Sequence, residues 1–162
     1  MKHTITALVE NRPGVLAKLI GLISGRGYNI ASLNVGPTQD STCSRITMVV
    51  QGDDHALEQV TLQLAKQVDV LRVEDVTSMN FISREMILVE VSTQKGGRSA
   101  ILQLALLFSA TVAAVQKDTI ILQKTGNQNQ IADFVRALRD FDVVDISRSG
   151  VIAVARDPVD EE

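Results

Sequence analysis

Several residue types that build chemical sites are scarce in this sequence, and each shortage removes a class of function. Among 162 residues there is one cysteine, Cys43, so neither an intrachain disulfide nor a thiolate zinc site can form within one chain. There is no tryptophan and aromatic residues make up only 3%, which leaves few rings to stack on nucleic-acid bases. The net charge of -3 comes without a basic block that could neutralise phosphates. We therefore expect no nucleic-acid partner.

Long hydrophobic runs are also missing. The longest, residues 100–115, is interrupted by Gln103, Ser109 and Thr111, and it falls short of the roughly 20 apolar residues that span a membrane. The first residues alternate between polar and apolar types and lack the apolar core of a signal peptide. We expect a cytoplasmic protein without a membrane partner. The apolar fraction of 45% is typical of a globular core.

The spacing of apolar residues predicts the same order of elements twice. In the first half we expect strands at residues 4–9, 28–35, 44–50 and 70–76, and helices at residues 15–23 and from Asp53 or Asp54 to Leu64. In the second half we expect strands at residues 85–92, 111–115, 119–124, 143–147 and 151–155, and helices at residues 100–108 and 131–138. The order βαββαβ predicts an α+β fold of two tandem ferredoxin-like domains, 1–77 and 78–162, divided at a polar junction.

In this fold both helices lie on one face of an antiparallel sheet, so the other face is left bare. The expected strand at residues 44–50 is not strongly polar on either side, since Ile46, Met48 and Val50 alternate with a set that includes Val49. Burial by a second sheet or subunit is therefore expected. We predict an oligomer.

Catalytic and metal-binding patterns are weak. His3 and His55 have no cysteine or carboxylate at metal-ligand spacing, so both are expected to be surface residues, and Cys43 an inert, half-buried thiol. Paired carboxylates occur only in local runs that suit helix caps or solvated ends. We expect no catalytic residue and no metal site. A small enzyme of this fold, such as an acylphosphatase, is an alternative that only Arg12 supports.

The strongest candidate for a binding site is the turn between the first expected strand and helix. Gly14 lets a ligand approach the helix N–H groups, which suit a carboxylate together with the helix dipole. The amide of Asn11 can accept from an ammonium and donate to a carboxylate, while Val15 and Leu16 can line an apolar pocket. The alternative is that Asn11 merely caps the helix and Pro13 takes its favoured first-turn position.

The same turn belongs to a longer resemblance. The segment Val9-Glu-Asn-Arg-Pro-Gly-Val-Leu16 resembles the opening of an ACT domain, the amino-acid-binding module of many biosynthetic enzymes. Residues 21–33, 37–38 and 44–47 closely resemble the small regulatory subunit of acetolactate synthase, also called acetohydroxyacid synthase. Residues 68–70, 84–89 and 148–150 extend the resemblance into the second half of the chain.

This resemblance implies a subunit without its own active site, which activates a catalytic large subunit in valine, leucine and isoleucine biosynthesis. It also implies feedback inhibition by a branched-chain amino acid, commonly valine. No cofactor is then expected in this chain, and thiamine diphosphate, Mg and FAD belong to the large subunit. The implied effector site lies between the ACT domains of a homodimer and uses Asn11, Gly14, Val15 and Leu16 of one chain with Asn29 and Ile30 of the other. Without the resemblance, Asn29 is better explained as a turn residue that tolerates a left-handed backbone after Gly27. A free-standing tandem ACT sensor of another enzyme is the alternative function.

Overall fold

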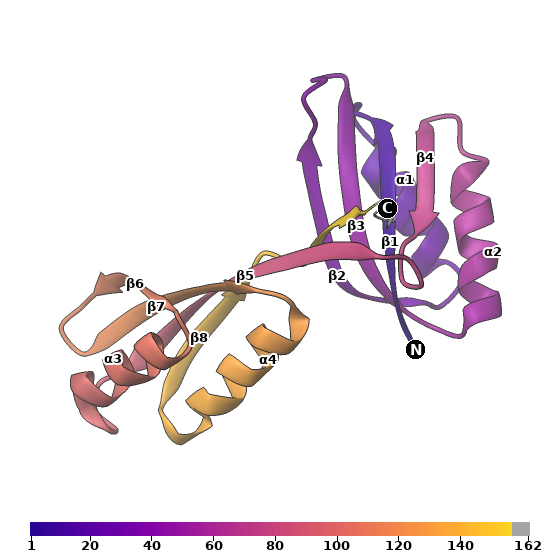
Figure 1. The fold of residues 1–162 in the computed structure, drawn as a ribbon. Helices are drawn as coiled ribbons and strands as arrows, with labels where there is room; N and C mark the ends of the chain where they lie inside the picture. The colour runs from indigo at the N-terminus through magenta and orange to yellow at the C-terminus, as the bar shows by residue number, and fades with distance from the viewer. Residues whose placement is uncertain (157–162) are drawn as a thin grey trace, which may run out of the picture. The chain divides into compact units, whose positions relative to one another are not determined.

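The computed structural model describes residues 1–156, apart from the side chain of Ala56, and contains the predicted βαββαβ order twice. Residues 1–82 and the described part of the segment that begins at Val151 form unit 1, and residues 83–150 form unit 2 (Figure 1). Unit 1 contains β1 (Lys2–Glu10), α1 (Val15–Ser24), β2 (Asn29–Pro37), β3 (Cys43–Gln51), α2 (Asp54–Ala65), β4 (Val70–Asp75) and β9 (Ile152–Ala155). Unit 2 contains α3 (Gly97–Leu107), β6 (Thr111–Val115), β7 (Thr119–Gly126), α4 (Gln128–Ala137), a 3-10 turn (Leu138–Asp140) and β8 (Val143–Arg148). The strand β5 (Phe81–Ser92) begins in unit 1 and continues into unit 2.

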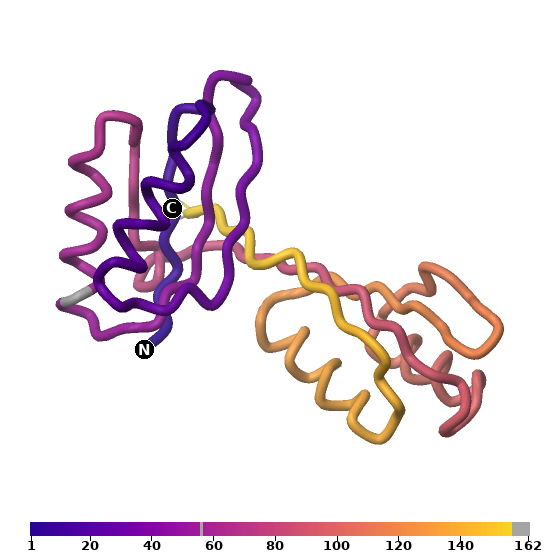
Figure 2. Tube along the Cα trace, turned by 180° about the vertical axis from the view of Figure 1, so that it is seen from behind, coloured from indigo at the N-terminus to yellow at the C-terminus, as the bar shows by residue number. Residues whose placement is uncertain are grey.

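Unit 1 is a four-stranded antiparallel sheet in the order β2-β3-β1-β4 with α1 and α2 on one face (Figure 2). Alternate residues of β1 and β3, such as Ile5 and Met48, point to the helices and are fully buried. The helices contribute Leu19, Ile23 and Leu57 to the same core. The helix predicted at residues 15–23 is confirmed, and its residues Val15, Leu19 and Ile23 are buried, whereas Leu16 is 37% exposed. The second predicted helix buries Leu57 and Leu64.

The opposite face of the unit 1 sheet is covered in part by the chain itself, whereas the sequence led us to expect cover by a second sheet or subunit. Thr6 and Thr47 lie on this face and are only 4% and 2% exposed. Residues of the chain's own last strand contribute to the cover, since Val151 and Ala153 are each 2% exposed and β1 contacts β9. The ferredoxin-like plan contains no such strand, and we had placed residues 151–155 in the second domain, so this cover was not predicted.

The expected division of the chain at residue 77 therefore differs from the observed units. We placed residues 151–155 in the second domain, whereas they belong to unit 1. The physical reason is local: the Val151 N–H donates to Ser32 Oγ at 2.9 Å, and the Arg156 N–H donates to the Asn80 carbonyl at 2.8 Å. Residues 157–162 of the expected second domain lie outside the described residues.

Unit 2 repeats the plan with a sheet in the order β6-β7-β5-β8, and β9 also pairs with β5. Ile87, Val89 and Val91 on β5 point to α3 and α4 and are fully buried. The rings of Phe108 and Phe134 pack between these helices and the sheet with centroids 5.6 Å apart. The strand predicted at residues 85–92 is confirmed and lies within β5.

Candidate effector site

The turn between β1 and α1 is held in place by backbone and side-chain hydrogen bonds. The Asn11 N–H donates to the Thr42 carbonyl at 2.7 Å, and Asn11 Nδ2 donates to the Ser41 carbonyl at 3.0 Å. Both acceptors belong to the β2–β3 hairpin. Asn11 therefore fastens the turn to this hairpin and does not cap α1, which rules out the alternative role that the sequence left open for it.

Gly14 is the residue that caps α1, and it adopts a left-handed conformation with φ 85° and ψ -16°. No side chain caps the helix at this end. The Val15 N–H donates to the Arg12 carbonyl at 3.4 Å. The next N–H groups of the first turn have no partner within the helix, and this end carries the positive end of the helix dipole. Pro13 precedes the cap and is outside the helix, so the first-turn position suggested for it is also not observed. The turn offers donors that suit a carboxylate.

The two apolar residues of the turn differ in exposure. Val15 is 6% exposed and belongs to the unit 1 core, so only its backbone faces the open end of the helix. Leu16 is 37% exposed and its side chain is available to a ligand. The sequence had assigned both side chains to one apolar pocket wall. Neighbouring helix residues point about 100° apart, which explains why the structure separates them.

Asn29 and Ile30 lie at the start of β2, at the opposite end of the same sheet. Asn29 pairs with Gln51 at one end of β3, whereas Glu10, next to the turn, pairs with Cys43 at the other end. The strand between these pairs spans about 26 Å at ~3.3 Å per residue. Asn29 is exposed, and Ile30 is half-buried against the core. One chain therefore does not bring the two predicted sets of residues together.

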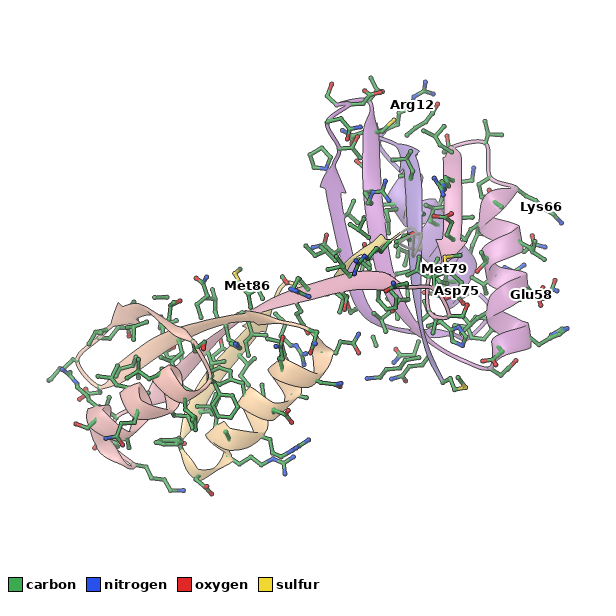
Figure 3. All side chains as sticks on the ribbon, in the orientation of Figure 1. Arg12, Glu58, Lys66, Asp75, Met79 and Met86 are labelled. Atoms are coloured by element: carbon green, nitrogen blue, oxygen red, sulfur yellow. The ribbon has the colours of Figure 1, made fainter. Side chains whose placement is uncertain are left out.

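A cavity of about 560 Å³ adjoins the β1–α1 turn on its hairpin side. It is lined by Glu10, Asn11, Arg12, Ser41, Thr42, Cys43 and Leu71. Arg12 projects at the end of the unit 1 sheet (Figure 3) and pairs with Glu10, with Nη1 and Oε2 3.2 Å apart. The hairpin residues were missed by sequence reasoning, because only the β1–β3 pairing brings them to the turn. Cys43 is half-buried, as predicted.

The prediction that His3 is a surface residue is wrong. His3 is 6% exposed, and its Nδ1 lies 2.8 Å from Asp75 Oδ2 while its Nε2 lies 3.1 Å from Asp54 Oδ1. Each ring nitrogen of His3 thus lies within hydrogen-bond distance of a carboxylate oxygen. Asp54 is at the start of α2, and Asp75, labelled in Figure 3, is at the end of β4. His3 on β1 therefore connects three elements. His55 is exposed, as predicted.

The surroundings of the Asp75 carboxyl lower its pKa. Burial acts to raise its pKa, but hydrogen bonds from Thr77 Oγ1 and the Thr77 N–H, together with His3, outweigh burial and place the pKa below the ordinary value. A cavity of about 520 Å³ lies beside His3 and Asp75 and is also lined by Glu58 and Leu62. The groups that bond to Asp75 are Thr77 and His3 of the same chain. Because His3 also contacts Asp54, the cluster connects β1, β4 and α2.

In unit 2 the turn between β5 and α3 has the same backbone but a different environment. Gly96 caps α3 with φ 86° and ψ -17°. A Cβ at this position meets Phe141 Cε1 at 3.2 Å, whereas a Cβ at Gly14 meets no heavy atom within 4 Å. Arg98 Nη2 donates to the carbonyls of Gln116 and Lys117 at 3.0 and 2.8 Å. The open turn is therefore the one in unit 1.

None of the helices within residues 1–156 combines the length and the apolar character that a membrane span requires.

The fold and the turn geometry define the class of protein: a tandem ferredoxin-like chain whose first unit is an ACT domain. Residues 5–72 match the family model described as "AHAS small subunit-like ACT domain", and residues 84–157 match the model "Small subunit of acetolactate synthase". The chain belongs to the family of acetolactate synthase small subunits.

Relatives along the whole chain agree with this assignment. This chain is 39% identical over 156 residues to a probable acetolactate synthase small subunit of Archaeoglobus fulgidus, and the match covers 96% of this chain and 98% of the relative. It is 40% identical over 157 residues to the acetolactate synthase small subunit of Bacillus subtilis, covering 96% and 91%. The crystal structure of the acetolactate synthase small subunit of Thermotoga maritima superposes with a TM-score of 0.87 at 32% identity, covering 98% of this chain and 99% of that one.

Proposed function

We propose that this chain is a regulatory subunit that activates the catalytic large subunit of acetolactate synthase and makes it sensitive to a branched-chain amino acid, valine above all. Membership of the small-subunit family supports the partner. One observation above all supports the effector: Gly14 opens α1 with no capping side chain and with open space where a Cβ would lie. The chain carries no active site of its own in this proposal, and thiamine diphosphate, Mg and FAD bind to the large subunit.

The chemistry of the turn suits a free amino acid. First-turn N–H groups and the helix dipole attract the carboxylate. An amide group has two N–H donors, of which Asn11 uses one on the Ser41 carbonyl, so the other N–H and the carbonyl oxygen remain for the ligand. The exposed side chain of Leu16 provides apolar contact for an aliphatic effector. A branched-chain amino acid combines these three features.

A homodimer completes the site through the edge of β2. β2 is an edge strand without a charged residue, whereas the other edge, β4, carries Arg72 and Glu74. Charges discourage pairing of edge strands, so β2 is the edge suited to pair with a second copy. Antiparallel pairing of two β2 strands sets the start of one beside the end of the other, and Pro37 at that end shares its row with Ser44 and Val9. Asn29 and Ile30 of the partner would then lie at the end of the sheet that carries the Asn11 turn.

Calorimetry tests effector binding directly. The chain is titrated with valine, leucine and isoleucine, alone and assembled with the large subunit, and we expect valine to bind. If none of the three binds under either condition, the sensing role is refuted.

Mixing with the large subunit tests the partner: we expect acetolactate formation to rise, and an unchanged rate would refute activation.

Charge at Gly14 tests the pocket. Gly14→Asp places a negative charge beside the ligand carboxylate, and Gly14→Asn is a matched variant of equal size and no charge. Both residues tolerate a left-handed backbone. We expect the Asp variant to assemble and activate but to lose inhibition, and the Asn variant to weaken inhibition less. Full inhibition of the Asp variant would refute the proposed pocket.

A further inference from the structure

The described end of the chain forms a strap on the unit 1 sheet. We define the strap as residues 151–156, which lie on the sheet face that α1 and α2 do not cover (Figure 1). Val151 and Ala153 are each 2% exposed. The strap is attached at both ends, because the Val151 N–H donates to Ser32 Oγ at 2.9 Å and the Arg156 N–H donates to the Asn80 carbonyl at 2.8 Å.

Ser32 reaches the strap because β2 is irregular beside the proposed effector residues. The pairing with β3 shifts between Ile30, opposite Val50, and Ser32, opposite Val49, so that Ala31 is an extra residue in β2. Residues two apart normally share a sheet face, but here Ile30 packs on the helix-side core while Ser32 bonds to the strap. The bulge turns Ser32 to the other face of the sheet.

A short path of the backbone connects the strap to unit 2. β8 ends at Arg148, Gly150 has φ 77°, and the strap begins at the next residue. The buried Val151 N–H requires an acceptor, and Ser32 Oγ provides it. This hydrogen bond ties the position of the start of the strap to that of Ser32.

We propose that Ser32 is a positioning residue that transmits effector binding at Asn29 and Ile30 to the strap. This inference rests on the proposed function and adds its route of regulation. An effector bound against the start of β2 contacts the residue next to the Ala31 bulge and favours one conformation of it. Ser32 carries this preference to Val151, and the strap carries it along the chain to β8. Valine inhibits to the extent that it binds more tightly to the conformation in which the strap is packed on the unit 1 sheet.

Hydrogen exchange on the complex with the large subunit tests the route without any mutation. We expect saturating valine to slow amide exchange in the strap by about fivefold or more, the lower end of usual coupling between sites. Amides in the middle of α2 are the internal control and should change by less than about twofold. Valine binding with unchanged exchange in the strap would overturn the inference and leave the proposed function intact.

Variants of Ser32 separate transmission from binding. Ser32→Ala removes the acceptor of the Val151 N–H, Ser32→Thr keeps a hydroxyl, and Ser24→Ala at the exposed end of α1 is the matched control. We expect Ser32→Ala to bind valine normally by calorimetry but to lose about fivefold or more of its inhibition, and Ser32→Thr and Ser24→Ala to behave as the wild type.

Two results of this experiment contradict the inference. Full inhibition of the Ser32→Ala complex shows that the strap is not the route. Loss of valine binding in the same variant shows that Ser32 belongs to the effector site. Absence of binding in the wild type is different, because it refutes the proposed function and the coupling with it.

Discussion

Gly14 and Gly96 have the same backbone conformation in the two repeats, and alanine at each position isolates the effect of its surroundings. Their φ and ψ angles are 85° and -16° at Gly14 and 86° and -17° at Gly96. A left-handed backbone costs an L residue about 1–2 kcal/mol, so both alanine variants bear the same strain. Any difference between their free energies of unfolding comes from what the new methyl group meets.

The structure gives that difference a sign and a size. At Gly14 the methyl group meets no heavy atom within 4 Å, so Gly14→Ala should destabilise unit 1 by about 1–2 kcal/mol from strain alone. At Gly96 it lies 3.2 Å from Phe141 Cε1 and 3.4 Å from Cδ1. Overpacking adds typically about 1–3 kcal/mol, and the half-buried Phe141 ring can shift, so we expect the lower end. Gly96→Ala should then destabilise unit 2 by about 2–3 kcal/mol.

Urea unfolding followed by two probes distinguishes the units. Tyr28 is the only tyrosine, the chain has no tryptophan, and Tyr28 packs on the unit 1 core, so its fluorescence reports unit 1. Far-UV circular dichroism reports both units, and each transition is analysed with its own midpoint and slope. Protein concentration is held constant because association changes apparent stability. Equal losses in the two variants would refute the Phe141 contact, and a loss above about 3 kcal/mol for Gly14→Ala would refute the open space around that residue.

Three further predictions concern single interactions. Glu85 accepts from Arg148 Nε and Nη2 at 2.7 and 2.8 Å, and its side chain is 4% exposed. Arg148→Met should therefore leave a buried charge and cost about 3 kcal/mol of stability in thermal unfolding. Adding Glu85→Gln to this variant should recover most of the lost stability, and no recovery would contradict the ion-pair reasoning. The pKa of Asp75 lies below its ordinary 3.8, so its ionised form stabilises the fold above pH 3.8 and this stabilisation is lost as the pH falls through the lower, folded-state pKa. Thr77→Val should raise the Asp75 pKa in an NMR titration and shift acid unfolding to higher pH, and an unchanged Asp75 titration would refute the role of the hydroxyl. Asn127 caps α4 in a reciprocal pair of hydrogen bonds, so Asn127→Ala should cost about 1 kcal/mol in chemical unfolding, and no loss would contradict the cap.

Local sequence patterns predicted the elements well where their signal is periodic. The expected strand at residues 111–115 has the observed bounds of β6, and the helix that begins at Val15 starts where expected. Periodicity was weaker at assigning single side chains. Val15 and Leu16 were both assigned to the lining of an apolar pocket, yet the first is in the core and the second is at the surface. The neighbouring elements decide which residues of a helix are buried, and the spacing of apolar residues carries no information about those elements.

Contacts between distant segments could not be read from spacing. His3 has partners 51 and 72 residues away, on α2 and β4, so no local pattern marks it as buried. The candidate turn was found because Gly14 and Asn11 lie close together in the sequence. The acceptors Ser41 and Thr42 were missed, since only the pairing of β1 with β3 brings the hairpin to the turn.

By itself the sequence determined the repeated βαββαβ order, the open turn at Gly14 and the family, because each depends on short-range spacing or on a contiguous string of residues. The tertiary structure alone decided that Asn29 lies at the far end of the sheet from Asn11, and that residues 151–155 join unit 1. A four-residue apolar strand such as β9 pairs with any sheet edge that it can reach. Its place is selected by the buried face it covers and by the acceptor that Ser32 offers, and both exist only after the chain has folded.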